Sequence, residues 1–362
     1  MKVIISGGGT GGHIFPAIAI ADEIKRRYPF ADILFVGAEG KMEMQRVPKA
    51  GYRIIGLPVR GLQRRLTLKN LMVPFLLLKS LRRAQTILRS FQPQVVVGVG
   101  GFASGPVLWV AAKEGIPTVI QEQNSYAGLT NRWLAQRVKK ICVAYAGMDK
   151  YFPESKLVLT GNPVRADILE VKTKRAEALV YFQVPAGHQV VVVTGGSLGA
   201  GSLNAALYQD HAALAGKPIF VLWQTGQSYW ERHPELPGII PAQIKVVPFI
   251  DRMDLAYAMA DLVICRAGAL SISELCVAAQ PAILIPSPNV AEDHQTKNAQ
   301  MIASAGGCYI VPDNQTTTRL IPLLLELLQN PVDLKKLSIA IGKLGKPQAT
   351  QHIVDEIVSL TA

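Results

Sequence analysis

Short apolar runs rich in valine and isoleucine recur along the chain, and stretches of helical periodicity separate them. The runs cover residues 3–6, 33–36, 95–99 and 118–120 in the first half and residues 190–194, 219–223, 262–265 and 282–285 in the second. They barely alternate and are followed by Gly, Pro or Ser, which is typical of strands buried on both faces of a parallel sheet. Strands and helices in this alternation predict an α/β fold with doubly wound sheets.

The length and two glycine-rich loops predict two domains. The chain has 362 residues, and a domain holds about 150 residues. In each half a strand leads into a glycine-rich loop and a helix, at residues 7–12 and 195–201. A tight turn alone could explain one such loop, but two at domain starts favour a bound ligand. We therefore expect two Rossmann-like domains, residues 1–164 and 165–344, with a ligand in the cleft between them.

Composition excludes several classes of protein. Hydrophobic residues make up 49% of the chain, so an intrinsically disordered protein is excluded. The longest apolar run, residues 71–78, is broken by Pro74, whereas a membrane-spanning helix needs about 20 residues. The N-terminus lacks an apolar region long enough for a secretory signal. The four cysteines show no CxxC spacing, which predicts reduced thiols and neither disulfides nor a zinc site.

The net charge of +12 comes from one segment of the chain. Between Met44 and Lys113 there is no acidic residue but there are twelve basic ones, while the rest of the sequence is balanced. Such a concentration of positive charge predicts contact with an anionic surface or a nucleic acid.

The first glycine loop fits two kinds of nucleotide site. Gly7, Gly9 and Gly12 satisfy GxGxxG, and Glu39 follows the second strand, so an NAD-dependent oxidoreductase stays open. A Walker A loop is excluded because His13 stands where that motif has lysine. At the mouth of a parallel sheet, His13 is a candidate general base. A histidine that merely bonds a nearby carbonyl is an equal alternative.

Polar residues follow three other strands. Ser271, Ser273 and Glu274 lie at a helix start after the strand 262–265, where Glu274 suits ribose hydroxyls or, alternatively, the helix dipole. The residues 292–299 offer Gln295 and Asn298 for sugar hydroxyls and a weak metal pair in Asp293 and His294, with a solvated helix start as the alternative. Residues 121–124, four long polar side chains in a row, are expected to line a polar cleft, with a surface turn as the alternative.

Seven motifs in this order resemble one family of enzymes. They are GGGTGGHIFPA (7–17), GGFASGP (100–106), EQN (122–124), GNPVR (161–165), GGSLGA (195–200), ALSISE (269–274) and DHQTKNA (293–299). Together they resemble the MurG family, the UDP-N-acetylglucosamine:undecaprenyl-diphospho-muramoylpentapeptide N-acetylglucosaminyltransferases of bacterial peptidoglycan synthesis. The resemblance spans essentially the whole chain. It implies a GT-B fold, with a C-terminal helix at about residues 345–362 that packs back onto the first domain.

The resemblance also implies roles for individual residues. The donor, UDP-GlcNAc, would lie mainly on the second domain. Its diphosphate would contact Ser197 and the helix start at Ala269, Leu270 and Ser271. Its uracil would contact the backbone of Ile250. Its ribose would bind Glu274, and its GlcNAc would bind Gln295. Asn124 and Arg165 would close the site from the other side. Thr10, Gly11 and Gly12 would line the diphosphates, and His13 would be the base.

The implied reaction is a single displacement. The C4 hydroxyl of the muramoyl sugar of lipid I attacks the anomeric carbon of GlcNAc, which inverts the anomeric centre and gives lipid II and UDP. No DxD-like acidic pair follows a strand within the donor motifs, so we expect no metal and no other cofactor. Two residues depart from the family pattern: Leu198 stands where Gln is common, and Phe102 where Tyr is common.

The basic segment, residues 60–89, is expected to contact a membrane. Apolar residues recur there at helix-like spacings, with basic residues between them: Leu66, Leu71, Phe75, Leu78, Leu81 and Leu88 with Lys79, Arg82, Arg83 and Arg89. This pattern predicts an amphipathic surface for anionic lipids, or alternatively a buried helix face with a solvated basic side. No nucleic-acid motif is present. We expect a peripheral protein at the cytoplasmic face of the inner membrane.

Other functions remain open at this stage. A UDP-GlcNAc epimerase would use the same donor without a lipid, and a non-catalytic nucleotide-sugar sensor would not need His13. Further proteins of cell-wall synthesis remain open as partners.

Overall fold

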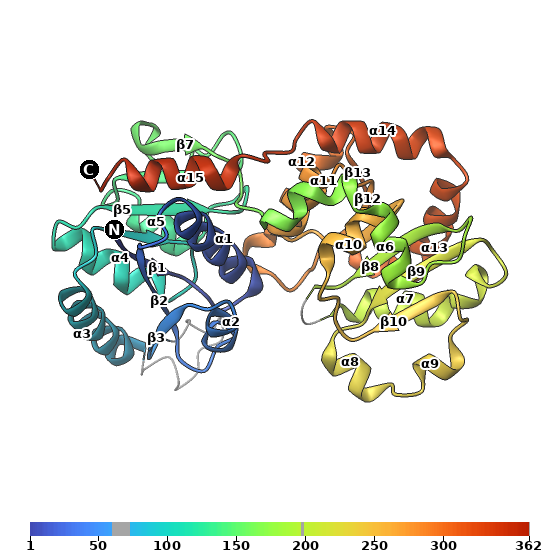
Figure 1. Ribbon diagram of the computed structural model, residues 1–362, viewed down its shortest axis with the longest axis horizontal. Helices are drawn as coiled ribbons and strands as arrows, with labels where there is room; N and C mark the ends of the chain where they lie inside the picture. Colours follow the sequence, from blue (N-terminus) through green and yellow to red (C-terminus); the bar gives the residue numbers. More distant parts are fainter. Residues whose placement is uncertain (60–72, 197–198, 362) are drawn as a thin grey trace. The chain divides into compact units, whose positions relative to one another are not determined.

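Figure 1 shows the computed structural model, which describes residues 1–59, 73–196 and 199–361. The chain forms two compact units, one of residues 1–165 together with 348–362 and the other of residues 166–347. Each unit is a parallel sheet covered by helices on both faces. This architecture confirms the expected fold class of two doubly wound α/β domains.

The sheet of the first unit has the strand order β3-β2-β1-β4-β5-β6-β7. Its strands are β1 (Lys2–Ser6), β2 (Asp32–Ala38), β3 (Arg53–Leu57), β4 (Val95–Gly98), β5 (Thr118–Glu122), β6 (Lys140–Val143) and β7 (Leu157–Leu159). Strand β1 pairs in parallel with both β2 and β4, so the strand order reverses between β1 and β4. A ligand of such a sheet binds at the carboxyl ends of the strands at this reversal point.

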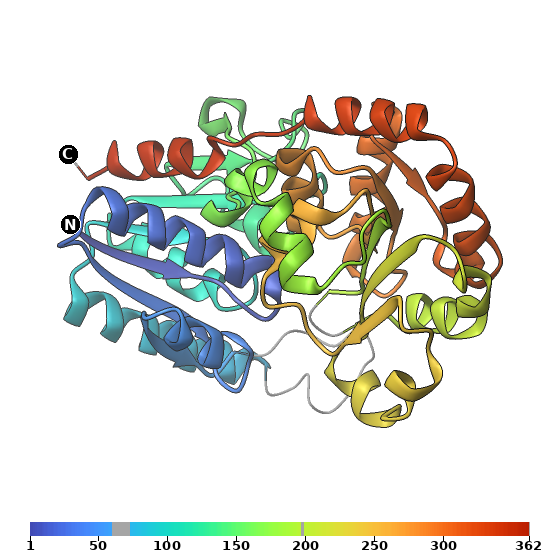
Figure 2. The same cartoon turned by 45° about the vertical axis from the view of Figure 1, so that its right-hand side comes forward.

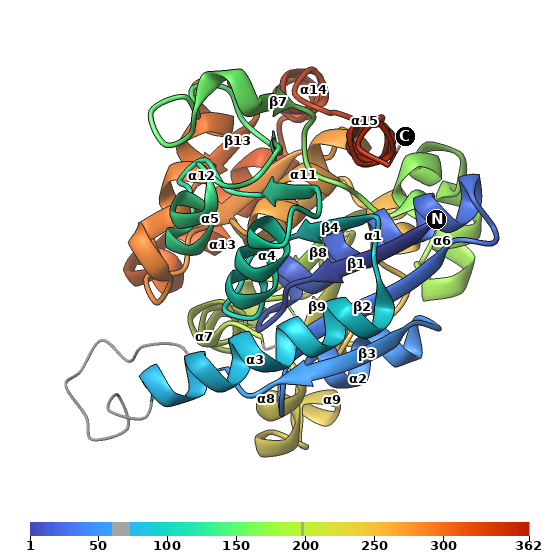
Figure 3. The same ribbon diagram turned by 90° about the vertical axis from the view of Figure 1, so that its left-hand side faces the viewer.

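Helices cover both faces of this sheet. They are α1 (Gly11–Arg27), α2 (Glu43–Lys49), α3 (Val73–Phe91), α4 (Ser104–Lys113), α5 (Leu129–Leu134) and α15 (Ala349–Val358), with a short 3₁₀ helix η2 (Glu154–Lys156). Helices α3, α4 and α5 lie along one face (Figure 3). Helices α1, α2 and α15 lie along the other.

The C-terminal helix α15 belongs to the first unit. Its residues Ile353, Val354 and Ile357 are fully buried in the core formed with α1 and β1. Arg27 bonds Asp355 at 2.5 Å. The two chain ends lie close together (Figure 2), and the Thr361 hydroxyl is 3.8 Å from the Met1 sulfur.

The second unit repeats this topology. Its strand order is β10-β9-β8-β11-β12-β13, with β8 (Gln189–Thr194), β9 (Ile219–Gln224), β10 (Ile244–Val247), β11 (Leu262–Arg266), β12 (Ala282–Ile285) and β13 (Cys308–Ile310). The helices are α6 (Arg175–Phe182), α7 (Gly201–Asp210), α8 (Gln227–Arg232), α9 (Leu236–Ile239), α10 (Met253–Met259), α11 (Ala269–Ala278), α12 (His294–Ser304), α13 (Thr316–Leu328) and α14 (Pro331–Gly342). The 3₁₀ helices are η3 (Ala166–Thr173), η4 (His211–Leu214), η5 (Ala291–Asp293) and η6 (Asp313–Gln315). The order reverses between β8 and β11.

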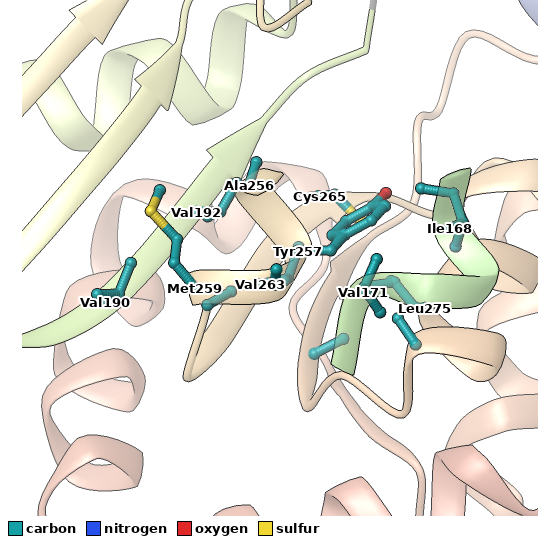
Figure 4. Packing of buried hydrophobic residues seen from close by; sticks show 14 of the residues in the cluster. Ile168, Val171, Val190, Val192, Ala256, Tyr257, Met259, Val263, Cys265 and Leu275 are labelled. Atoms are coloured by element: carbon teal, nitrogen blue, oxygen red, sulfur yellow. The ribbon is translucent and has the colours of Figure 1, made fainter. Parts of the chain in front are cut away.

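One of the two cores of this unit bears on the candidate site. Tyr257 of α10 is buried between Ile168 and Val171 of η3 and Leu275 of α11 (Figure 4). Its hydroxyl reaches out of this core to donate to Glu274 at 3.2 Å. Apolar packing therefore holds the hydroxyl that orients a candidate ligand-binding carboxylate.

The four cysteines are free and buried. Burial raises the pKa of each thiol, Cys142, Cys265, Cys276 and Cys308, to about 12, so they are poor nucleophiles. Within the described residues, no helix combines the length and the apolar character that a membrane crossing requires.

Candidate active site

The first glycine loop is shaped around a buried carboxylate. Glu43, near the start of α2, is only 1% exposed. Its Oε1 accepts the backbone N–H of Ala38, and its Oε2 accepts that of Gly9, both at 2.9 Å. A β-carbon on Gly8 would overlap this carboxylate, and one on Gly37 would lie 2.6 Å from Glu43 Cγ. Glycine is therefore required at both positions to admit the carboxylate.

His13 lies where the loops after β1 and β4 meet. Its Nδ1 is 3.1 Å from the carbonyl oxygen of Gly8 and 3.3 Å from the hydroxyl of Thr10. Because a carbonyl only accepts hydrogen bonds, Nδ1 carries the proton, and Nε2 of the neutral ring then has the lone pair. Gly100 has φ +91° and lies against the Nε2 edge of this half-buried ring. His13 therefore does bond a nearby carbonyl, as the alternative to a general base predicted. The same bond sets the tautomer that leaves Nε2 able to accept a proton.

Thr10, Gly11 and Gly12 form the start of α1. Thr10 is the N-cap and makes no side-chain cap bond, and its carbonyl accepts from the backbone of His13 at 3.1 Å. The first backbone N–H groups of a helix have no acceptor within it, and the helix dipole is positive at this end. The loop can therefore meet an anionic group at the carboxyl end of β1.

The expectation that residues 121–124 line a cleft is wrong for three of the four. Gln121, Glu122 and Gln123 are buried. The carboxylate of Glu122 accepts the backbone N–H of Asn124 at 3.0 Å and the side chain of Asn131 at 2.8 Å. Satisfied bonds of this kind fix a loop from inside. Asn124 alone is half-buried.

The same network reaches the end of the first unit. Gln121 donates to the Asn162 side chain at 2.9 Å, and Asn162 donates to the carbonyl of Gln123 at 3.0 Å. The GNPVR motif is therefore tied to β5 through Asn162. Arg165, the last residue of this motif, is half-buried.

In the second unit the loop after β8 is equally tight. Gly199 has φ +76°, and a β-carbon there would collide with the carbonyl of Thr225. Gln224, at the end of β9, donates to the carbonyl of Gly196 at 2.8 Å and accepts the N–H of Ile250 at 3.0 Å. The Ile250 side chain is buried. Ser197 and Leu198 lie outside the described residues.

The α11 start follows β11 at the reversal point of the second sheet. Gly268 is its N-cap and brings no capping side chain, so the first turn at Ala269, Leu270 and Ser271 presents backbone N–H groups. Ser273 instead bonds back to the carbonyl of Ala269 at 2.9 Å. Glu274, one turn along, is half-buried.

Arg266, the last residue of β11, joins several segments at this edge. Its guanidinium donates to Asp313 at 2.5 Å and to the Ser202 hydroxyl of α7 at 3.1 Å. It also donates to the carbonyls of Ile285 and Pro286 after β12, at 3.2 and 3.3 Å. A planar fork with several donors suits this role better than a lysine ammonium does.

Gln295 holds the loop after β12. Its Oε1 accepts the backbone N–H of Ser287 at 2.8 Å. The expectation that Asn298 reads sugar hydroxyls is wrong, because Asn298 is fully buried. Asp293, the N-cap of α12, accepts from the Thr296 hydroxyl at 2.7 Å and makes no capping bond to the helix backbone. Within the described residues, no group of three metal-binding side chains occurs.

Sequence reasoning missed Glu43, Arg266 and Gln224 as organisers of the two loops. Arg266 carried a signal, because it directly follows the predicted apolar run 262–265, but its partner Asp313 is distant in sequence. Glu43 carried none, since it looks like an ordinary acidic residue at a helix start.

Comparison with known proteins gives the following relatives. Two family models match, the glycosyltransferase family 28 N-terminal domain over residues 3–143 and the glycosyltransferase family 28 C-terminal domain over residues 190–353. The chain is 50% identical over 359 residues to a Flavobacterium psychrophilum protein named UDP-N-acetylglucosamine--N-acetylmuramyl-(pentapeptide) pyrophosphoryl-undecaprenol N-acetylglucosamine transferase, covering 99% of this chain and 97% of that protein.

Solved structures agree with these matches. Acinetobacter baumannii MurG is 31% identical, with a TM-score of 0.78 over 99% of both chains. The UDP-GlcNAc 2-epimerase from Neisseria meningitidis, bound to UDP-GlcNAc, is 14% identical, with a TM-score of 0.69 over 99% of this chain and 100% of that one. At this identity the epimerase shares only the fold.

Proposed function

We propose that this chain, which belongs to glycosyltransferase family 28, transfers N-acetylglucosamine from UDP-GlcNAc to the undecaprenyl-diphosphate-linked N-acetylmuramyl-pentapeptide, lipid I. The products are lipid II and UDP. The observation that carries this proposal is the 50% identity, over 99% of the chain, to a transferase named for this reaction.

The second unit supplies the donor half-site in this proposal. The N–H groups at the start of α11 face the diphosphate together with the Gly195–Gly201 loop, which includes Ser197. Glu274, oriented by Tyr257 at 3.2 Å, accepts the ribose hydroxyls. Gln295 holds GlcNAc, and the backbone at Ile250 meets uracil.

In the first unit, His13 acts as the general base. Its Nε2 takes the proton of the attacking C4 hydroxyl as that oxygen bonds to the anomeric carbon, and the bond to UDP breaks. No enzyme nucleophile is needed, because attack from the opposite face inverts the centre in one step. The developing charge on UDP is stabilised by helix N-termini and Arg165, with Asn124 beside the sugar.

Helix α3 supports a membrane-binding role for the first unit. Phe75 is 78% exposed, and Leu78 is 49% exposed, while Lys79 and Arg82 are exposed beside them. Further along the helix, Leu88 is buried in the core. The expected amphipathic surface is therefore exposed at the N-terminal end of α3, around Phe75 and Leu78. At the C-terminal end of α3, around Leu88, it is packed into the core.

This exposed end suits a surface of anionic lipids. Each basic residue near such a surface contributes about 1 kcal/mol, and the apolar side chains can enter the headgroup region. We therefore assign the protein to the membrane face that carries lipid I. Residues 60–72, with Leu66 and Leu71, lie outside the described residues.

Two alternatives lose support. The epimerase shares only the fold with this chain. The dinucleotide alternative was based on the glycines Gly7, Gly9 and Gly12 and on Glu39. The Glu39 carboxylate pairs with Arg83 at 2.6 Å.

The test is UDP release by the purified protein given UDP-GlcNAc, with and without a soluble short-chain lipid I analogue. Release that requires the analogue supports the transferase. Release without it supports an epimerase or hydrolase, and tight UDP binding without release supports a sensor.

A further inference from the structure

The peptide group between Gly8 and Gly9 is bonded at both of its ends by ionisable side chains. Its N–H, on Gly9, donates to Oε2 of Glu43 at 2.9 Å. Its C=O, on Gly8, lies 3.1 Å from Nδ1 of His13. A single rigid plane thus connects a buried carboxylate to the imidazole. The second carboxylate oxygen is held by the N–H of Ala38 at 2.9 Å.

We propose that Glu43 is a positioning residue for His13, acting through this peptide group as a carboxylate–peptide–imidazole relay. The proposal rests on the proposed function, in which His13 is the base. Glu43 does not touch the substrate in this account. It fixes the peptide plane, and the peptide plane fixes the imidazole.

Several features of the chain accommodate the buried carboxylate of Glu43. Burial of a carboxylate is unfavourable unless hydrogen bonds compensate it. Here both oxygens receive backbone N–H groups, and two glycines, Gly8 and Gly37, lack the β-carbons that would exclude the side chain. An ordinary acidic residue at a helix start would remain in solvent and need none of this.

The relay has a direct electrostatic consequence. A charge-assisted bond at the N–H end polarises the peptide and strengthens the carbonyl at the other end as an acceptor. The stronger acceptor holds the proton on Nδ1 of His13, so the lone pair stays on Nε2. It also stabilises the imidazolium that forms when Nε2 takes a proton, the role that a directly bonded aspartate has in catalytic triads.

Two carboxylates on the neighbouring elements are engaged elsewhere. Glu39, after β2, pairs with Arg83. Glu122, at the end of β5, accepts from Asn124 and Asn131. The Thr10 hydroxyl, 3.3 Å from Nδ1 of the imidazole, does not titrate near neutrality.

The relay also divides the work of the first loop. The N–H of Gly9 donates to Glu43 and is therefore not available to bind a phosphate. The N–H groups that face an anionic ligand are those of the α1 start, at Gly11 and Gly12. The loop is therefore organised before a ligand arrives.

The test is the variant Glu43→Gln, because glutamine is isosteric but has one acceptor oxygen and no charge. Whichever way its amide turns, Ala38 or Gly9 faces an NH₂ group. We expect kcat to fall by about tenfold, with KM for UDP-GlcNAc within about twofold of the unchanged enzyme. The acid limb of the pH profile of kcat should move to lower pH by about half a unit, since a carboxylate that stabilises the imidazolium is gone.

The matched control is Glu39→Gln, which removes an exposed carboxylate four residues away and should leave the acid limb in place. Equal shifts in both variants would overturn the proposal. So would a raised KM with an unmoved acid limb, because that pattern indicates a merely structural role. If Glu43→Gln does not fold, Glu43→Asp keeps the charge and should retain the acid limb while kcat falls.

A second readout does not depend on the reaction. Nitrogen NMR of His13 in the ligand-free protein should show the Nδ1–H tautomer and a pKa that falls in Glu43→Gln but not in Glu39→Gln. If lipid I is not the acceptor, this NMR result still stands. An Nε2–H tautomer in the unchanged protein would overturn the relay whatever the reaction is.

Discussion

Gly100 lies against the imidazole of His13, so that a β-carbon on Gly100 would stand 2.9 Å from Nε2 and 2.8 Å from Cδ2. Gly100 also has φ +91°, a backbone conformation that residues with a β-carbon rarely adopt. The loop after β4 thus packs against Nε2 of His13, the nitrogen proposed to take the proton.

Gly100→Ala should therefore displace the ring and lower kcat by about a hundredfold, since small misplacements of a reacting group are costly. The control is Gly115→Ala, which has φ +77° and no atom within 4 Å of the added carbon. Both variants should lose about 1 kcal/mol of stability from backbone strain, but Gly115→Ala should keep full activity. Steady-state kinetics and urea unfolding measure the two effects, and equal kinetic losses would refute the contact with His13 as the cause.

Arg266→Lys tests the donor half-site. Lysine keeps the charge but cannot bond Asp313, Ser202 and two carbonyls at once, so the carboxyl edge of the second sheet should loosen. We expect KM for UDP-GlcNAc to rise by about tenfold. Arg319→Lys, at an exposed arginine bonded to Gln315 at 2.9 Å, should leave KM unchanged. An unaltered KM in Arg266→Lys would show that this edge does not support donor binding.

Replacement of Phe75 and Leu78 by serine tests the membrane surface. Both side chains are exposed, so the fold should persist, but binding to vesicles containing anionic lipid should weaken by at least about tenfold. Phe30→Ser is the control, because Phe30 is 99% exposed on the loop after α1. Sedimentation with vesicles at low and high salt measures binding. Full binding by the double variant, or an equal loss in Phe30→Ser, would contradict the assignment of this surface.

Asp254 should make stability depend on pH. It is 1% exposed and bonded to Arg252 at 2.8 Å and Lys174 at 3.1 Å. Hydrogen bonds from Arg252, and then from Lys174, hold the pKa of Asp254 well below its usual range, although burial opposes them. Because the folded-state pKa is lowered, its stabilisation is fully present above the unfolded value of about 3.9 and is lost as the pH falls below it.

Asp254→Asn should cost about 1.5 kcal/mol at pH 7, since it removes the buried carboxylate that accepts charged hydrogen bonds from Arg252 and Lys174. The difference from the unchanged protein should shrink below about pH 4. Urea unfolding at several pH values measures it, with the exposed Asp251→Asn as control. A difference that stays constant down to pH 2 would mean that the ion pair is not its source.

The central strands were predictable from sequence because both their faces are buried. The predicted run 282–285 coincides with β12, and 190–194 with all but one residue of β8. Strands β3, β7, β10 and β13 escaped prediction because they lie at the sheet edges. Strands β7 and β13 have three residues each, β3 begins with Arg53 and β10 contains Lys245, so none of these strands holds four apolar residues in a row. Strand β6, next to an edge, likewise begins with a lysine and holds only three apolar residues in a row.

The site was predictable only as far as local sequence determines geometry. The glycine loops and the α11 start follow from strand–loop–helix patterns. The contact of Glu43 with Gly9 spans 34 residues, and that of Gln121 with Asn162 spans 41, so neither leaves a local pattern. The polar residues 121–123 indicated an unusual segment, but the sequence did not indicate that their side chains are buried inside the first unit.

The central claim is tested most directly by determining which product the enzyme forms from the acceptor. Purified protein is incubated with UDP-GlcNAc and a short-chain lipid I analogue, and the analogue is followed by mass spectrometry and NMR. The account predicts one added N-acetylhexosamine in β linkage at the muramoyl C4, in step with UDP release and largely lost in His13→Ala. An unchanged analogue while UDP is released, or an α-linked product, would contradict it.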